Sequence, residues 1–218
     1  MRHDVRVPGR ASQGSLRGAT PIPKILIVAP SWIGDALMAQ PLLARLHEKI
    51  PGLRLDALVP EWVAPVVRRM PEVDEVIVAP FRHGPLQLRE RWRLGRELKA
   101  RRYDQSIVLP NTWKSALVPF FADIPLRSGY KGESRYGLLN LIYQDDKRNP
   151  MAAHYAALSE PPGKELKLPL PEPRLRFAAH EVRATQHKFG VGAPYAVFCP
   201  GAEYGPAKRW PYFASLIS

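Results

Sequence analysis

Residues 24–35 read KILIVAPSWIGD, an apolar run followed by a loop with proline and glycine that ends in aspartate. A short apolar run of this kind is typical of a strand, and Gly and Pro mark the turn that follows it. From about Ala36 to Lys49 apolar residues return at helical spacing. The segment therefore predicts a strand, a loop and a helix.

The same alternation continues along the chain. Further strands are predicted at LRLDALV (53–59), DEVIVA (74–79), YDQSIVL (103–109) and LRSGY (126–130). Helical patterns separate them at 61–70, 85–102 and 112–122. Strands joined by helices imply crossover connections and a parallel sheet. The fold class predicted is α/β.

Four regions are expected from composition. Residues 1–23 lack apolar periodicity and predict a flexible basic tail. Residues 24–160 form the α/β domain, and 161–173 (PPGKELKLPLPEP) hold five prolines, which favour an extended linker. Residues 174–218 predict the start of a second α/β domain, with a helix near 180–189 and a strand YAVFC at 195–199.

Composition narrows the class of protein. The chain has 218 residues, 45% hydrophobic content and a net charge of +12. Its single cysteine, Cys199, excludes an internal disulfide and is predicted to be buried. Neither a membrane-spanning run nor a secretory signal is evident, so a cytoplasmic location is expected. The charge favours polyanions, but no nucleic-acid-binding module is found.

Asp35 closes the PSWIGD loop at the end of a predicted strand, where ligands bind in open α/β sheets. Two interpretations are open. Asp35 can be a carboxylate favoured by the positive end of a helix dipole. It can also be a general base that takes a proton from a sugar hydroxyl.

The loop PGAEYGPAKRW, residues 200–210, also lies between a predicted strand and a predicted helix. Gly201 allows the backbone to approach a phosphate, and Lys208 and Arg209 supply positive charge. The spacing is neither that of a Walker A motif nor that of a dinucleotide fingerprint. An ordinary turn and a phosphate site are both compatible with this loop.

Two further segments carry polar residues at strand ends, LPNTWKSALVPFF (109–121) and YKGESRYGLLN (130–140). Asn111 or Thr112 suits a helix cap. Lys114 is a cation in the first helical turn, where the helix dipole disfavours positive charge. This placement favours an anionic ligand near Lys114.

The predicted helix 85–102 has seven basic residues against two glutamates, with Leu88, Trp92 and Leu98 expected on one side. It is either a solvated face or a surface for anionic lipid.

Four ordered blocks, VAPSWIGDALMAQPLL, LPNTWKSALVPFF, GYKGESRYGLLN and CPGAEYGPAKRWP, resemble the lipopolysaccharide heptosyltransferases of glycosyltransferase family 9. Within the family, the enzymes that add the second heptose are the more similar. The resemblance implies a GT-B architecture of two Rossmann-like domains, with the acceptor on the first and the sugar nucleotide on the second. It also implies inverting, metal-independent transfer from ADP-heptose to heptosyl-Kdo-lipid A, at the inner face of the cytoplasmic membrane and without a cofactor.

The resemblance assigns roles to individual residues. It implies that Asp35 is the general base. Donor phosphate contacts are implied for Gly201, Lys208 and Arg209. Acceptor contacts are implied for Ser31, Trp32, Asn111, Lys114, Glu133 and Arg135.

The family continues beyond this pattern for about one more domain, so we expect residues 1–218 alone not to transfer heptose at a normal rate and to expose apolar side chains after residue 174. Two alternatives stay open. One is a heptosyltransferase that adds the first heptose to Kdo. The other is a non-catalytic polyanion-binding protein. Histidine and cysteine spacing predicts no metal site.

Overall fold

The computed structural model describes residues 22–82, 84–145, 149–192, 194–199 and 210–217. The chain divides into two compact units, one ending at Leu175 and one beginning at Arg176. Most of the tail predicted at 1–23 lies outside the described residues.

The first unit is built on a parallel sheet of six strands in the order β3-β2-β1-β4-β5-β6. The strands are β1 (Lys24–Val28), β2 (Arg54–Pro60), β3 (Glu75–Ala79), β4 (Gln105–Val108), β5 (Leu126–Tyr130) and β6 (Leu141–Tyr143). The first five were predicted. Strand β6 was missed, because its three residues are too few for a periodic signal.

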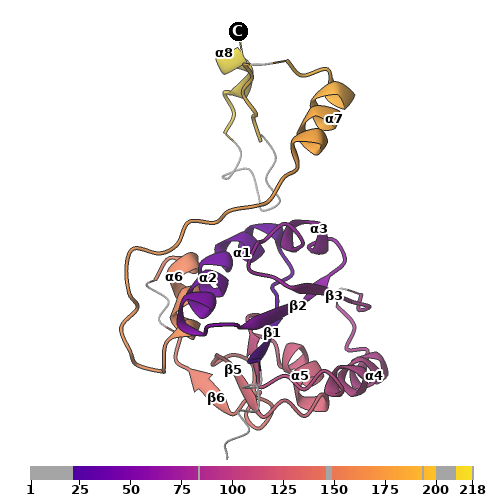
Figure 1. Ribbon diagram of the computed structural model, residues 1–218, viewed down its shortest axis with the longest axis vertical. Coiled ribbons are helices and arrows are strands. Elements are labelled where there is room, and N and C mark those ends of the chain that lie inside the picture. Colours follow the sequence, from indigo (N-terminus) through magenta and orange to yellow (C-terminus); the bar gives the residue numbers. More distant parts are fainter. Residues whose placement is uncertain (1–21, 83, 146–148, 193, 200–209, 218) are drawn as a thin grey trace, which may run out of the picture. The chain divides into compact units, whose positions relative to one another are not determined.

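Helices cover both faces of this sheet (Figure 1). Those on one face are α1 (Ile33–Met38), α2 (Gln40–Lys49), α3 (Ala64–Val67) and α6 (Met151–Ala156), the last continued by the 3-10 turn η2 (Ala157–Ser159). Those on the other are α4 (Leu88–Lys99) and α5 (Leu117–Phe121), the latter preceded by the 3-10 turn η1 (Trp113–Ala116).

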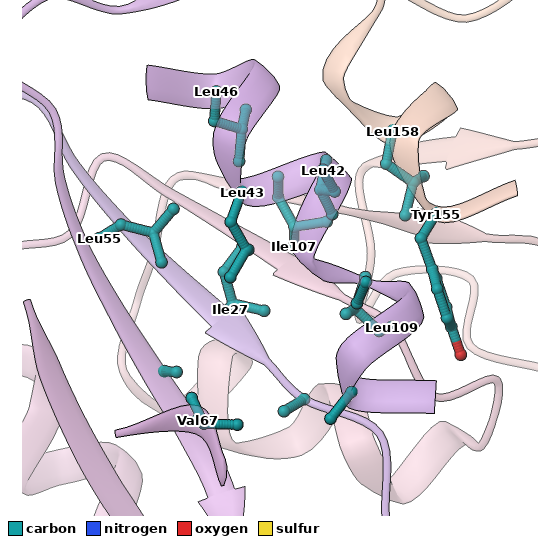
Figure 2. Packing of buried hydrophobic residues seen from close by; sticks show 14 of the residues in the cluster. Ile27, Leu42, Leu43, Leu46, Leu55, Val67, Ile107, Leu109, Tyr155 and Leu158 are labelled. Atoms are coloured by element: carbon teal, nitrogen blue, oxygen red, sulfur yellow. The ribbon is translucent and has the colours of Figure 1, made fainter. Parts of the chain in front are cut away.

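Strand β1 supplies both cores, because successive side chains point to opposite faces. Ile25 and Ile27 pack under α1, α2 and α6, whereas Leu26 and Val28 pack under α4 and α5. Figure 2 shows the first of these cores, in which leucines of α2 meet Ile27 and its neighbours. Each buried aliphatic side chain contributes roughly 1.5–3 kcal/mol to folding.

Four predicted helices differ from those observed, and the one expected at 61–70 is reduced to α3 (Ala64–Val67). The helix expected at 36–49 is two helices that meet at Ala39, because Pro41 lacks an amide hydrogen and favours the first turn of a new helix. The helix expected at 112–122 begins as a 3-10 turn. The helix expected at 85–102 is shorter, and Gln87 precedes it with a left-handed backbone.

The buried face of α4 also differs from the prediction. Leu88, Trp92 and Leu98 were expected on one side, but Leu98 is buried whereas Leu88 and Trp92 are exposed. Arg91 and Leu94 take their place against the sheet. Residues 91, 94 and 98 follow helical spacing and therefore share the inner face of the helix.

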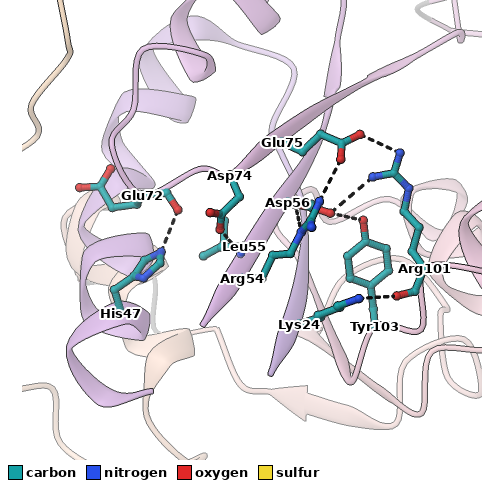
Figure 3. A network of polar contacts seen from close by, with 10 residues as sticks. All are labelled: Lys24, His47, Arg54, Leu55, Asp56, Glu72, Asp74, Glu75, Arg101 and Tyr103. Atoms are coloured by element: carbon teal, nitrogen blue, oxygen red, sulfur yellow. Dashed lines mark hydrogen bonds and ion pairs between the residues drawn. The ribbon is translucent and has the colours of Figure 1, made fainter. Parts of the chain in front are cut away.

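A network of charged side chains links neighbouring strands at the edge of the sheet where the strands begin, opposite their carboxyl ends (Figure 3). Asp56 in β2 is 1% exposed. Its carboxylate accepts a hydrogen bond of 2.6 Å from the hydroxyl of Tyr103 and pairs with Arg54 and Arg101. Arg101 also binds Glu75 at 2.7 Å, and this bond holds the pKa of the Glu75 carboxyl below its usual value. The network stabilises the edge that does not carry the predicted site.

The second unit contains α7 (Ala179–Phe189), as predicted, and α8 (Phe213–Ile217). The strand expected at 195–199 is absent from the described residues, and Cys199 is exposed, so both predictions are wrong for this structure. A strand requires a hydrogen-bonded neighbour, and the described part of this unit offers none. Phe189, Val197 and Tyr212 are more than half exposed, as expected for this segment.

Candidate functional site

The predicted site residues of the first unit gather at one edge of the sheet. All six strands run parallel, so the loops that follow them meet at their carboxyl ends, where open α/β sheets bind ligands. Ser31, Trp32 and Asp35 follow β1, Asn111 and Lys114 follow β4, and Glu133 and Arg135 follow β5.

Asp35 lies in the first turn of α1. Its side chain is half-buried and has no hydrogen bond or ion pair to the part of the chain that the structure describes. The position satisfies the helix-dipole interpretation. The unpartnered carboxylate also leaves Asp35 able to accept a proton from a ligand.

Helix α6 packs against α1 and brings Tyr155 near Asp35. Burial, and then the negative charge of Asp35, raise the pKa of the Tyr155 hydroxyl to about 12. Figure 2 shows Tyr155 extending from α6 past Leu109. Sequence analysis missed this tyrosine, because no helix was predicted between 141 and 160.

A basic cavity of about 350 Å³ opens at the ends of β1 to β4. Ser31 and Lys114 line it, together with Arg82 and Arg91, which the sequence analysis did not single out. Val28, Leu58 and Val118 give it an apolar floor. None of the described residues that line this cavity is acidic, so it suits a ligand that is anionic at one end and apolar or neutral at the other.

The cationic groups of the cavity are held in place by backbone carbonyls. Lys114 Nζ donates to the carbonyl of Gly84 at 2.8 Å. Arg91 donates through Nε to Leu86 at 2.6 Å and through Nη1 to the carbonyl of Lys114 at 3.1 Å. Its guanidinium lies 4.1 Å from the centre of the Phe81 ring, and burial lowers its pKa. These contacts orient the charges before any ligand arrives.

Ser31 and Trp32 lie at the entrance to α1. The carbonyl of Ser31 accepts a hydrogen bond of 2.7 Å from the indole of Trp62, another residue that lines the basic cavity. Trp32 is 44% exposed at the position before the helix.

Glu133 and Arg135 join the loops that follow β4 and β5. Glu133 accepts a hydrogen bond from the amide of Trp113 at 3.0 Å, and its own amide donates to the carbonyl of Asn111 at 3.1 Å. Arg135 is 2% exposed and donates to the carbonyls of Pro110 and Tyr130 and to Asn111 Oδ1. The guanidinium that the resemblance placed against the acceptor is therefore turned inward, where it holds the two loops together.

Three predicted donor residues, Gly201, Lys208 and Arg209, lie outside the described residues. Within the described ranges, no group of three His, Cys, Asp or Glu side chains is arranged to hold a metal ion. Among the same residues, no helix is both long and apolar enough to cross a bilayer.

Comparison with known proteins agrees with this geometry. The model of the family described as "Glycosyltransferase family 9 (heptosyltransferase)" matches residues 91–218. "Lipopolysaccharide heptosyltransferase 2" of Escherichia coli (strain K12) is 45% identical over 199 residues, which are 87% of this chain and 57% of that protein. "Lipooligosaccharide heptosyltransferase 2" of Haemophilus ducreyi is 43% identical, with the same shares covered.

Solved structures give the same result. The structure of Escherichia coli ADP-heptose LPS heptosyltransferase II matches with a TM-score of 0.78 and 42% identity, over 89% of this chain and 61% of that one. The chain thus spans 57% of the length of the curated relatives named above. The predicted resemblance and fold class are confirmed.

Proposed function

Because the chain belongs to glycosyltransferase family 9, we propose that it is the acceptor-binding part of a heptosyltransferase, with the beginning of the donor-binding part. The reaction is transfer of heptose from ADP-heptose to heptosyl-Kdo-lipid A, the inner core of lipopolysaccharide. The observation that carries this proposal is the half-buried carboxylate of Asp35, which has no hydrogen bond or ion pair to the described residues and lies at the sheet edge that also holds the basic cavity. The names of the relatives that match over 87% of the chain favour the second heptose over the first.

In the proposed reaction, Asp35 accepts the proton of an acceptor hydroxyl. The hydroxyl oxygen then attacks the anomeric carbon of the donor heptose, and the bond from that carbon to ADP breaks with inversion. Lys208 and Arg209, with the backbone at Gly201, stabilise the charge that develops on the departing ADP. The protein groups suffice for this chemistry, and the proposal includes no metal or cofactor.

The basic cavity is proposed to receive the anionic part of the acceptor. Phosphates and Kdo carboxylates are the negative groups of such a glycolipid, and Lys114 and Arg82 face the cavity with positive charge. Ser31 and Trp32 contact the acceptor beside Asp35. Arg135 and Glu133 act indirectly, by holding the loop that carries Asn111 and Lys114.

The outer face of α4 is proposed to lie on the anionic inner surface of the cytoplasmic membrane, where the lipid acceptor resides. Leu88 and Trp92 are about half exposed, and Arg89, Arg93 and Arg96 are exposed beside them. At helical spacing these five residues share one side of α4, opposite the buried Arg91, Leu94 and Leu98. An arginine-rich face with an interfacial aromatic residue suits anionic head groups.

Heptose transfer to heptosyl-Kdo-lipid A, followed by mass spectrometry, tests the reaction. A protein that carries this sequence at full family length is expected to transfer heptose, and Asp35→Ala is expected to lower kcat by about 10²–10⁴-fold. Glu97→Ala, which removes an exposed carboxylate from α4, is the matched control and should leave kcat unchanged.

The stability and the kcat of the same variants together separate the two interpretations of Asp35. A carboxylate that only complements the helix dipole contributes about 0.3–1 kcal/mol to the unfolding free energy, so Asp35→Ala would then lose up to that amount and keep its kcat. A variant that folds with a similar small loss but has lost its kcat supports the general base. A full-length protein that folds, binds polyanions and transfers no heptose would replace this proposal by the polyanion-binding alternative.

A further inference from the structure

A second cavity, of about 290 Å³, lies on the other side of the loop that follows β4. Pro110 and Thr112 line the basic cavity, whereas Leu109 and Asn111 line this one. Alternate residues of an extended segment point in opposite directions, so one short loop separates the two cavities. The two cavities therefore lie on either side of the loop that follows β4.

Among the described residues, those that line the second cavity offer hydrogen-bonding groups and no cation. Asn111, Asp145, Asn149, His154 and Tyr155 are the described polar residues that line it. The carboxylate of Asp145 repels anions, and the amides of the two asparagines both donate and accept hydrogen bonds. A neutral, polyhydroxylated group fits the described part of this lining better than a phosphate or carboxylate.

The imidazole of His154 is held on several sides. It stacks on the Tyr130 ring, with 3.8 Å between ring centres and 17° between planes. The Tyr130 hydroxyl donates to the backbone carbonyl of His154. His154 Nδ1 lies 3.3 Å from Asp145 Oδ1, and the His154 side chain is 12% exposed. A ring fixed in this way is preorganised to contact a ligand.

This arrangement determines which ring nitrogen carries the proton. Burial lowers the pKa of His154, and the nearby Asp145 offsets this only in part, so the ring is neutral near pH 7. The carboxylate of Asp145 selects the tautomer with hydrogen on Nδ1. Nε2 then keeps its lone pair, and none of the described residues donates a hydrogen bond to it.

The second cavity is connected to Asp35 through Tyr155. Tyr155 lines the cavity and at the same time lies within the electrostatic influence of the Asp35 carboxylate. Helix α6, which carries both His154 and Tyr155, packs against α1, which carries Asp35. A sugar bound in this cavity would therefore lie on the same side of the sheet as the proposed base.

We propose that this second cavity is a saccharide subsite, in which His154 Nε2 accepts a hydrogen bond from a hydroxyl of the acceptor sugar and Asn111 contacts the same sugar. The inference rests on the proposed function, because it divides the acceptor between two cavities. The anionic groups enter the basic cavity and the neutral heptose ring enters this one. Asp145 and Tyr130 are positioning residues that keep the imidazole in its place and tautomer.

The tautomer and the contact can be measured in the chain of residues 1–218. In a chain with ¹⁵N-labelled histidine, NMR should show hydrogen on Nδ1 and a bare Nε2 for His154. Addition of deacylated heptosyl-Kdo oligosaccharide should move the Nε2 resonance of His154. His47 lies in α2, and its Nε2 contacts the carbonyl of Glu72. The Nε2 resonance of His47 should not move and serves as the internal reference.

Two variants test the assignment. His154→Phe keeps a ring to stack on Tyr130 but removes Nε2, and it should weaken binding of the oligosaccharide about tenfold. Asp145→Ala should mix the two tautomers of His154 in the free chain and weaken binding less. Circular dichroism checks that both variants fold, and the tautomer of the unmodified chain is measured independently of either variant.

Several outcomes would overturn the inference, and they are distinguishable from failure of the proposed function. Resonance shifts that spare His154, with heptose transfer intact in the full-length protein, would remove the subsite and leave the function standing. So would unchanged affinity in His154→Phe. If the oligosaccharide moves no resonance of the folded chain and the full-length protein transfers no heptose, the subsite and the proposed function fall together.

Discussion

Asp35 and Arg135 carry opposite charges at the same edge of the sheet, and they differ in their hydrogen bonds to the rest of the chain. The Asp35 carboxylate is half-buried and free of hydrogen bonds to the described residues. The Arg135 guanidinium is buried and bonded to three acceptors of the chain. A buried guanidinium needs such partners, because leaving a charged donor unpaired costs several kcal/mol. Arg135 therefore holds the loops after β4 and β5 together, and in our proposal it acts on the acceptor indirectly.

The close approach of two loops predicts an effect of a single methyl group. A Cβ at Gly132 would lie 2.2 Å from the carbonyl oxygen of Asn111, so Gly132→Ala forces the backbone apart. The expected loss is about 1–3 kcal/mol of unfolding free energy, measured by urea denaturation.

Gly34→Ala is the matched control for this prediction. A Cβ at Gly34, within α1, meets nothing within 4 Å, and alanine has the higher helix propensity. Its stability should be equal to, or up to about 1 kcal/mol greater than, that of the natural sequence. Equal losses in the two variants would contradict the proposed loop contact.

At the scale of elements, α4 has two faces of different character. Arg91, Leu94 and Leu98 form its inner face, and Arg91 extends from there into the basic cavity. The outer face carries exposed arginines around Trp92. The same helix thus supplies one cation to the cavity and, in our proposal, several to the lipid surface.

The outer face of α4 can be tested with lipid vesicles. Arg89→Glu with Arg93→Glu should reduce sedimentation of the chain with anionic vesicles by about tenfold or more, because each basic residue near such a surface contributes about 1 kcal/mol. Trp92→Ala should weaken vesicle binding even at high salt, because salt screens the charges but not the apolar contact that this variant removes.

A control for net charge comes from α3. Arg68 follows that helix and is exposed. Paired with Arg183→Glu in α7, Arg68→Glu makes the same change in net charge as the double variant of α4. Equal loss of vesicle binding in both double variants would show that total charge, and not the face of α4, determines the attraction.

At the scale of the whole molecule, buried tyrosines link stability to alkaline pH. Burial raises the pKa of the Tyr130 and Tyr155 hydroxyls to about 12, above the ordinary value of 10. The folded protein therefore keeps protons that the unfolded chain releases. This contribution is fully present below about pH 10 and is lost as the pH rises through 12.

The expected result is an unfolding free energy that declines above about pH 10. Tyr155→Phe should make this decline shallower, since one of the retained protons is gone. Tyr195→Phe changes an exposed residue and should leave the decline as it was. Urea denaturation between pH 8 and pH 11 is the measurement, and an identical slope in Tyr155→Phe would contradict the prediction.

The order of strands and helices from Lys24 to Tyr130 could be predicted from the sequence, because hydrophobic periodicity is a local property. The apolar runs of β1 and β4 are visible in short stretches, whereas the break before Pro41 and the inner face formed by Arg91, Leu94 and Leu98 were missed. The position of Asp35 at a strand end follows from the same local pattern. Whether residues 195–199 form a strand could not be predicted from a local pattern, since a strand pairs with a neighbour elsewhere in the chain.

The direction and the contacts of the side chains at the site depend on tertiary packing. Arg135 turns inward because the loop after β4 passes over it, and His154 meets Asp145 and Tyr130 because α6 folds back onto the sheet. These contacts join residues that no periodicity relates. Sequence pattern determines which elements form, because each element's hydrogen bonds and apolar spacing are local. Packing between distant segments determines which polar groups remain free for a ligand.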